Sequence, residues 1–158
     1  MTPSFRIAAL GAALLLIGSR TAQAQTDHLH IGAHLGYNFD VKDPNLGVQF
    51  SYPIAHHLEI YPSVDYYFVS GIKEWGFNAD LKWRVARDQP RWFYVGAGLN
   101  IMRVSFAGVS STTEHANLIM GAESLRGQVH PFAELRAILG RGSSVQVQAG
   151  LNITLGRH

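Results

Sequence analysis

Apolar side chains alternate with polar or small ones along this sequence, and the alternation recurs about eight times after residue 27. The clearest case is the segment 74–85, where the odd-numbered residues are apolar and the even-numbered residues are polar or glycine. Because successive side chains of a β-strand point to opposite faces, each segment predicts a strand with one apolar and one polar face. The predicted strands are 28–39, 46–54, 58–68, 74–85, 93–101, 116–122, 129–137 and 145–155.

Short connections separate the predicted strands, and most of them contain Gly, Pro, Asp or Asn. Such connections predict an antiparallel up-and-down arrangement, since parallel neighbours need long crossovers. The predicted fold class is therefore all-β, an eight-stranded antiparallel up-and-down β-barrel with both ends of the chain on the same side. We expect one of these short connections at 107–114. At Pro62 we expect a β-bulge or a register different from the regular alternation, because proline cannot donate to a strand ladder.

The first 24 residues have the pattern of a cleavable signal peptide. Arg6 precedes an uncharged apolar run at 7–18, and Ala22 and Ala24 form a small-residue cleavage site. The run is too short for a membrane-spanning helix, which needs about 20 residues. We therefore expect a signal peptide at 1–24 and a barrel domain at 25–158. Removing Arg6 and Arg20 from the thirteen Lys and Arg leaves eleven against eleven Asp and Glu, which gives no basic footprint for nucleic acid.

Alternation alone fits two inside-out architectures: a membrane barrel that is apolar outside, and a soluble lipocalin-like barrel that is apolar inside. Glycine recurs on the polar face, as at Gly76, Gly98 and Gly150. An eight-stranded barrel has a narrow interior, so small residues are needed there to make room for large ones. Only 15% of the chain is charged, which is low for the surface of a soluble domain. Both observations favour a transmembrane barrel whose polar face lines the lumen.

Aromatic residues lie near both ends of the predicted apolar bands, as in the two girdles of membrane barrels. Trp75 and Trp83 lie eight residues apart on one face. At about 3.3 Å per residue and a tilt of about 40°, they are separated by roughly 20 Å along the membrane normal. The predicted girdle residues are Tyr37, Phe39, Tyr52, Tyr66, Phe68, Trp75, Phe77, Trp83 and Phe93.

Charged residues on the polar face would be buried in the lumen, where they are tolerated only when paired and hydrogen-bonded. We expect the charges of the 74–85 strand to pair with carboxylates of the preceding strand, and Glu134 and Arg136 to lie beside Glu123. The predicted lumen salt-bridge network comprises Glu59, Asp65, Glu74, Asp80, Lys82, Arg84, Glu123, Glu134 and Arg136.

Three segments carry a resemblance to a known family: 92–99 (WFYVGAGL), 131–136 (PFAELR) and the patterned last strand. With these, residues 25–158 resemble the small bacterial outer-membrane β-barrels of the OmpA transmembrane-domain and OmpX type. The resemblance implies an insertion signal in the last strand, and Gln148, Gly150, Ile153 and Leu155 match its pattern. Aliphatic residues replace the usual aromatic ones, and residues 156–158 follow in place of a terminal Phe.

A few residues in the sequence are candidates for metal binding or catalysis. His28 and His30 lie at i and i+2 on one face of a strand, where two imidazoles can share a metal, but no cysteine or patterned carboxylate completes a site. Ser63 with Asp65, and Ser124 with Glu123, lack a positioned histidine. Barrel enzymes such as the lipid A deacylases would need a His-x-Ser pair on a strand, and none occurs in the sequence. We expect no catalytic residues, no metal and no cofactor.

The predicted function is that of a non-enzymatic barrel in the outer membrane of a Gram-negative-type cell, with a filled polar lumen and a structural role in the envelope or modest surface contacts. The alternative is a binding module for a small ligand or ion, which includes the soluble lipocalin-like barrel. Expected partners are outer-membrane lipid and the barrel-insertion machinery, without nucleic acid. Outward residues of the last three strands are mostly small or aliphatic, and we expect a protein contact on that side.

Overall fold

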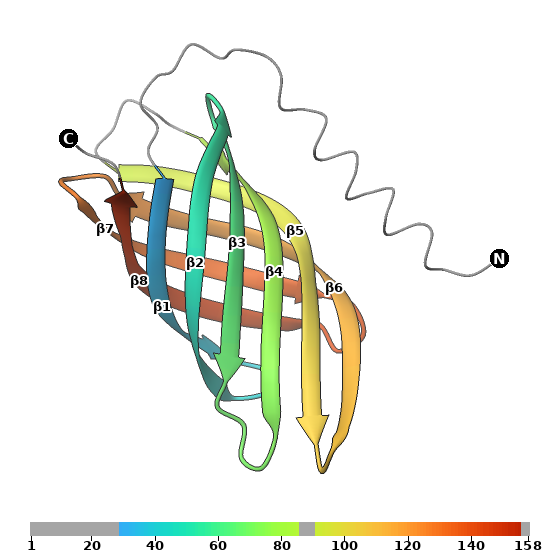
Figure 1. The fold of residues 1–158 in the computed structure, drawn as a ribbon. Coiled ribbons are helices and arrows are strands. Elements are labelled where there is room, and N and C mark those ends of the chain that lie inside the picture. Colours follow the sequence, from blue (N-terminus) through green and yellow to red (C-terminus); the bar gives the residue numbers. More distant parts are fainter. Residues whose placement is uncertain (1–28, 86–90, 156–158) are drawn as a thin grey trace.

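Eight antiparallel strands close on themselves in the computed structural model, which describes residues 29–85 and 91–155. Each strand pairs with its neighbours in sequence, and β8 pairs with β1 to complete the barrel (Figure 1). The strands are β1 (Leu29–Asn38), β2 (Asp43–Ala55), β3 (Leu58–Tyr67), β4 (Lys73–Arg84), β5 (Arg91–Phe106), β6 (Val109–Ser124), β7 (Val129–Leu139) and β8 (Ser144–Leu155). The predicted fold class is confirmed. The predicted signal peptide and His28 lie outside the described residues.

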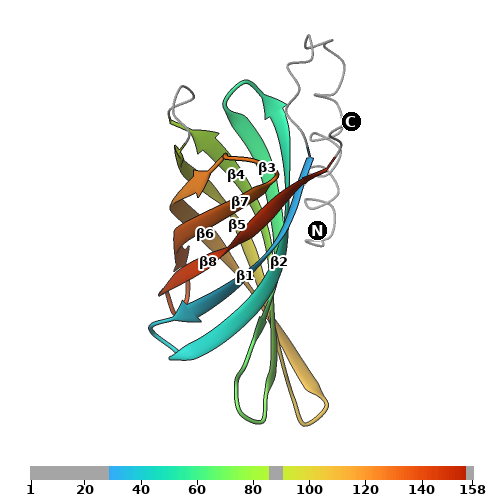
Figure 2. The same cartoon turned by 90° about the vertical axis from the view of Figure 1, so that its left-hand side faces the viewer.

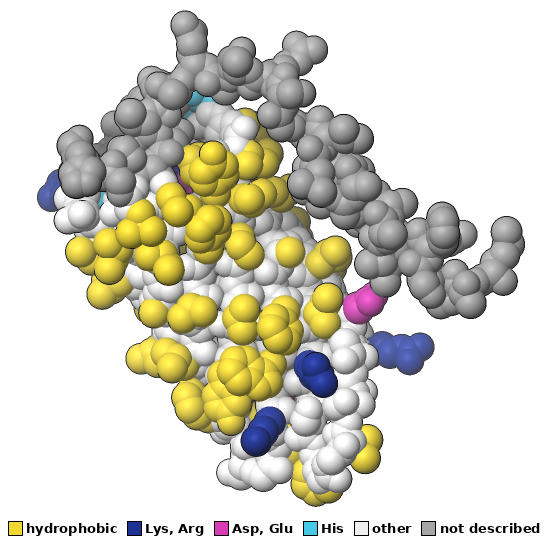
Figure 3. Space-filling model, viewed as in Figure 1, with side chains coloured by type: hydrophobic (Ala, Val, Ile, Leu, Met, Phe, Trp, Pro, Cys, Tyr) yellow, Lys and Arg dark blue, Asp and Glu magenta, His cyan; other side chains and the backbone are white. Residues whose placement is uncertain are grey.

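The alternating pattern decides which face of each strand is inside. In β4, the even-numbered residues from Gly76 to Arg84 are buried, whereas Trp75 and Trp83 are exposed. Hydrophobic side chains are spread over the outer wall on the face shown in Figure 3. The interior instead holds most of the buried polar and charged side chains. The described residues include no helix long and apolar enough to cross a membrane.

Several lumen glycines lie where no larger residue fits. A Cβ on Gly98 would lie 2.3 Å from the backbone oxygen of Ala79 on β4, and a Cβ on Gly121 would lie 2.4 Å from the Tyr94 hydroxyl. Close packing in a narrow lumen therefore explains why the inward face alternates between glycine and large side chains.

The prediction of a connection at 107–114 is wrong in its bounds, because the connection in the structure is shorter. β5 and β6 pair continuously as far as Phe106 opposite Val109, and only Ala107 and Gly108 form the turn, both with positive φ (48° and 84°). Two-residue hairpin turns favour positive φ because it matches the twist of the strands. Figures 1 and 2 show this hairpin projecting beyond the wall at the end opposite the start of β1.

The β-bulge or changed register expected at Pro62 is not found there; the register shift between β2 and β3 lies elsewhere. The β2–β3 register has the same phase on both sides of Pro62, with Gln49 opposite Ser63 and Tyr52 opposite Ile60. The register shifts instead between Pro53 and Ala55, beside the β2–β3 turn. A shift at the end of the ladder disrupts fewer hydrogen bonds than one at its centre.

Candidate functional site

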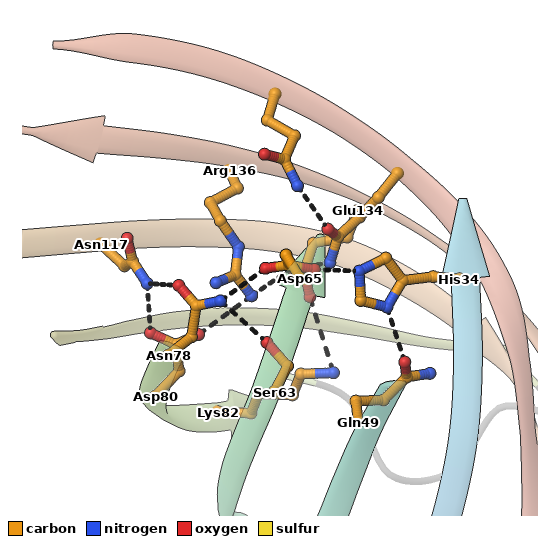
Figure 4. Close-up of polar contacts among 12 residues, drawn as sticks. His34, Gln49, Ser63, Asp65, Asn78, Asp80, Lys82, Asn117, Glu134 and Arg136 are labelled. Atoms are coloured by element: carbon orange, nitrogen blue, oxygen red, sulfur yellow. Dashed lines mark hydrogen bonds and ion pairs between the residues drawn. The ribbon is translucent and has the colours of Figure 1, made fainter. Parts of the chain in front are cut away.

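The centre of the lumen is crossed by ion pairs between β4 and β7 (Figure 4). Lys82 Nζ lies 3.6 Å from Glu134 Oε2, and Arg136 Nη2 lies 3.0 Å from Asp80 Oδ2 and 3.1 Å from Glu134 Oε1. Two strands, β5 and β6, separate β4 from β7 along the wall, so these contacts reach across the interior. Arg136 is fully buried, and its charge is offset by two carboxylates.

Aromatic residues surround the ammonium group of Lys82. The nitrogen lies 3.1 Å from the centroid of the Tyr61 ring and 4.1 Å from that of Tyr94. The Tyr94 hydroxyl donates to Glu134 Oε2 at 2.9 Å, which ties the same carboxylate to β5. Cation–π attraction is strongest when the cation is desolvated, as it is here.

A second cluster is centred on Asp65 of β3 (Figure 4). Its carboxylate lies 2.6 Å from His34 Nε2 and accepts a hydrogen bond from Asn78 Nδ2 at 2.6 Å. The other ring nitrogen of His34 lies 2.6 Å from Gln49 Oε1. The same Asn78 amide donates to the Ser63 hydroxyl at 3.0 Å. This cluster ties β1, β2, β3 and β4 together inside the wall.

Arg84 and Glu59, two further residues of the predicted network, lie nearer the mouth of the barrel beside the β2–β3 turn. Arg84 pairs with Glu59, which also accepts a hydrogen bond from the Ser51 hydroxyl at 2.7 Å. The Arg84 guanidinium lies over the Trp92 ring, 3.8 Å from its centroid. Glu74 is only half-buried near the opposite end and forms no ion pair with the residues that the structure describes.

The expected pairing of these charges is partly wrong. Arg84 does face a carboxylate of β3, but Asp80 and Lys82 pair across the lumen with β7. Gly121, not Glu123, lies opposite Glu134, because the β6–β7 register places Glu123 opposite Phe132. Sequence alternation assigns a side chain to a face of the sheet, but the pairing inside depends on barrel closure and stagger.

Glu123 has different neighbours, which the sequence did not indicate. Its Oε1 accepts a hydrogen bond from Asn152 at 2.8 Å and lies 3.8 Å from His130 Nδ1, and His30 of β1 completes the group. The neighbour of Glu123 along β6, Ser124, points to the opposite face of the strand. Ser124 and Glu123, which the sequence analysis considered together, therefore face opposite sides of the wall.

The predicted girdle residues lie on the outer wall, eight of them exposed and Tyr66 half-buried. At the end opposite the start of β1, the Tyr66 ring packs edge-on against Phe68 and Trp75, with centroids 5.3 and 4.9 Å apart. At the other end, Trp83 stacks on His57 with centroids 5.9 Å apart. Aromatic residues thus occupy both ends of the wall, and their place in a membrane stays a prediction.

The four residues of the predicted insertion signal lie on β8. Gln148 is buried in the lumen, whereas Ile153 and Leu155 are exposed on the wall. A Cβ on Gly150 would lie 2.2 Å from the backbone oxygen of Ala33, so glycine is needed there for the closure of β8 onto β1. Strand packing alone therefore explains why residue 150 is glycine, whether or not the last strand also serves as an insertion signal.

An apolar groove runs along the outer wall over β5–β8. It is lined by Val85, Phe93, Val95, Gly121, Ala122, Ala133, Leu135 and Val147, among others. Its lining includes the small residues Gly121, Ala122 and Ala133, which lie on β6 and β7. The protein contact expected there stays a prediction.

No protein-family model matches the sequence, and no curated protein matches it. Solved structures do match. The N-terminal β-barrel domain of Pseudomonas aeruginosa OprF is 18% identical, with 80% of this chain and 98% of that domain covered and a TM-score of 0.67. The chain has the fold of the small outer-membrane β-barrels.

Two more barrels show how widely this fold is used. Neisserial surface protein A is 17% identical, with 81% of this chain and 96% of that chain covered and a TM-score of 0.64. The outer-membrane enzyme PagL is 13% identical, with 80% of this chain and 99% of that chain covered and a TM-score of 0.58. Because one of these neighbours is an enzyme, the fold alone does not decide whether this barrel is catalytic.

Proposed function

We propose that the chain is a non-enzymatic outer-membrane β-barrel with a filled polar lumen and a structural role in the cell envelope. The observation that carries the proposal is the inside-out arrangement of the barrel, with an apolar wall around a lumen of paired charges. A soluble barrel would expose that wall to water, and soluble proteins rarely expose apolar patches of such extent. Membrane barrels present such a wall to lipid.

The residues of the lumen also support a non-enzymatic role. Ser63 accepts a hydrogen bond from the Asn78 amide, and the neighbouring Asp65 is engaged by His34 and Asn78. A serine nucleophile needs a base that takes its proton, and an amide N–H cannot accept one. These contacts place no such base at the Ser63 hydroxyl.

Location is tested by cell fractionation. We expect the mature protein in the outer-membrane fraction, extracted by detergent and running as a heat-modifiable band in gel electrophoresis. Closed barrels retain their hydrogen-bonded wall in detergent until they are heated, because no strand edge is open. Recovery of the protein in the soluble periplasm would contradict the proposal.

The filled lumen is tested by planar-bilayer recording. We expect no large steady conductance from the purified barrel, because Tyr61, Lys82 and Arg136 are buried across the middle of the lumen. An eight-stranded barrel has an interior just wide enough for such side chains. A variant with Tyr61→Ala and Lys82→Ala is the matched comparison, since it removes bulk and one central ion pair. A large steady conductance of the unaltered barrel would show that the lumen is a pore.

A further inference from the structure

Three ionisable side chains from three strands converge at the mouth of the barrel where β1 begins and β8 ends. His30 lies on β1, Glu123 on β6 and His130 on β7, and one ligand atom from each lies within 4.8 Å of the others. His30 is opposite Thr154 and His130 is opposite Asn152, so β8 lies between the two histidines. All three are buried, with exposed fractions of 7%, 6% and 5%. We propose that they form a binding site for a divalent transition-metal ion of the Zn²⁺ class.

The hydrogen bonds of His130 leave one ring nitrogen available as a ligand. Nε2 lies 3.0 Å from the carbonyl oxygen of Gly127, and a carbonyl oxygen only accepts, so Nε2 carries the hydrogen. The Thr154 hydroxyl lies 3.5 Å from the same nitrogen. Nδ1 then holds a lone pair, is buried and has no hydrogen-bond partner. Metal-bound histidines typically donate their second ring N–H to a backbone carbonyl in this way.

The distance between the potential ligand atoms suits one small ion. His130 Nδ1 and Glu123 Oε1 are 3.8 Å apart, too far for a hydrogen bond. Two ligands at about 2.0–2.2 Å from one tetrahedral zinc ion lie roughly 3.4 Å apart, so a shift of a few tenths of an ångström brings both into place. The rings of His30 and His130 lie edge to face with centroids 5.0 Å apart. Two imidazoles and one carboxylate are a known zinc ligand set that leaves a fourth position for water.

The carboxylate is held in place by amides. Asn152 Nδ2 donates to Glu123 Oε1 at 2.8 Å, and Asn152 Oδ1 accepts from Gln49 Nε2 at 2.8 Å. Gln49 in turn contacts His34, so the site is connected to the Asp65 cluster. Such outer hydrogen bonds orient a ligating carboxylate before the metal arrives.

Charge in the lumen also favours a cation at this place. Lys82 forms an ion pair with Glu134, and Arg84 forms one with Glu59. Arg136 pairs with both Asp80 and Glu134, and Asp65 lies 2.6 Å from His34. Glu123 instead faces an amide and the more distant imidazole of His130. A buried carboxylate is costly unless a charge compensates it, and a divalent ion supplies that charge. The site goes beyond the structural role proposed above and does not depend on it.

The test is zinc binding by the untagged full chain, refolded in detergent micelles, treated with a chelator and titrated with ZnCl₂. Refolding makes the outcome independent of cellular location. We expect saturable binding of one Zn²⁺ by calorimetry and by metal analysis, together with a higher thermal unfolding midpoint, because binding to the folded state alone stabilises it. Binding by His130→Gln and by Glu123→Gln should be at least tenfold weaker.

His115→Gln is the matched control, since His115 lies near the middle of β6, away from Glu123, and is partly exposed. Its zinc affinity should equal that of the unaltered chain. If His130→Gln fails to fold, as judged by gel mobility before and after heating, His30→Gln provides the same test. Absence of saturable binding, or binding that the His30, Glu123 and His130 variants retain, would overturn the proposal.

Discussion

Replacing Arg136 with methionine is expected to lower the free energy of unfolding by about 3–5 kcal/mol, the loss typical when one partner of a buried ion pair is removed. The guanidinium is fully buried and compensates both Asp80 and Glu134. Methionine has a similar length but no charge, so both carboxylates lose part of their compensation. Urea unfolding of the micelle-bound barrel, followed by tryptophan fluorescence, measures the change.

Arg103→Met is the matched control, because Arg103 is exposed on β5 and should contribute within about 0.5 kcal/mol. Adding Asp80→Asn to Arg136→Met should restore part of the lost stability, because it removes one of the uncompensated charges. Equal losses for Arg136→Met and Arg103→Met would mean that the central ion pairs do not hold the lumen together.

The wall of the barrel was predictable from sequence because its signal is local. In β4, side chains of one parity face the lumen and those of the other face outward, so the burial of Asp80 and the exposure of Trp83 follow from the pattern. The same reasoning placed Gly98 inside, where the structure shows the backbone of β4 in close approach. Periodicity therefore predicted the wall strands and their faces, and the short connections predicted their order.

The contacts inside the lumen were not predictable in the same way. Lys82 pairs with Glu134, 52 residues away, because closure and stagger of the barrel bring β4 opposite β7. His30 meets His130 for a similar reason, since β8 closes onto β1. Ile119 is apolar, yet it is buried in the lumen against Tyr61 and Tyr94. A side chain that fits the interior by shape gives no polar signal.

The length of the β5–β6 hairpin was missed because its strands lose their apolar face. From Ser110 to Glu114, β6 is exposed and largely Ser and Thr, so no period of two is visible. Backbone pairing and the two positive-φ turn residues extend the ladder instead. Strands that project beyond a barrel wall have no buried side, and the alternation that marks a wall strand is lost there.

Gly98→Ala should destabilise the barrel by about 1–3 kcal/mol or more, the range for overpacking a close-packed interior. The new Cβ would lie 2.3 Å from the Ala79 backbone oxygen and 2.5 Å from the Asp80 Cα. These are backbone atoms of the neighbouring strand, in register with Gly98, so relief requires the β4–β5 ladder to move. Such a movement would also displace Asp80 from Arg136. The same urea unfolding measurement reports the loss.

Gly76→Ala is the comparison variant, because it separates this backbone clash from the general effect of adding side-chain volume to the lumen. A Cβ on Gly76 would meet the Tyr67 ring at 3.2 Å and the Asn100 amide at 3.5 Å, and both are side chains that can shift slightly. We therefore expect Gly76→Ala to cost less than Gly98→Ala, while Gly150→Ala, which meets the backbone oxygen of Ala33 at 2.2 Å, should cost as much. Equal losses at Gly76 and Gly98 would mean that glycine serves the lumen through volume alone, and that close approach of neighbouring strands is not the constraint.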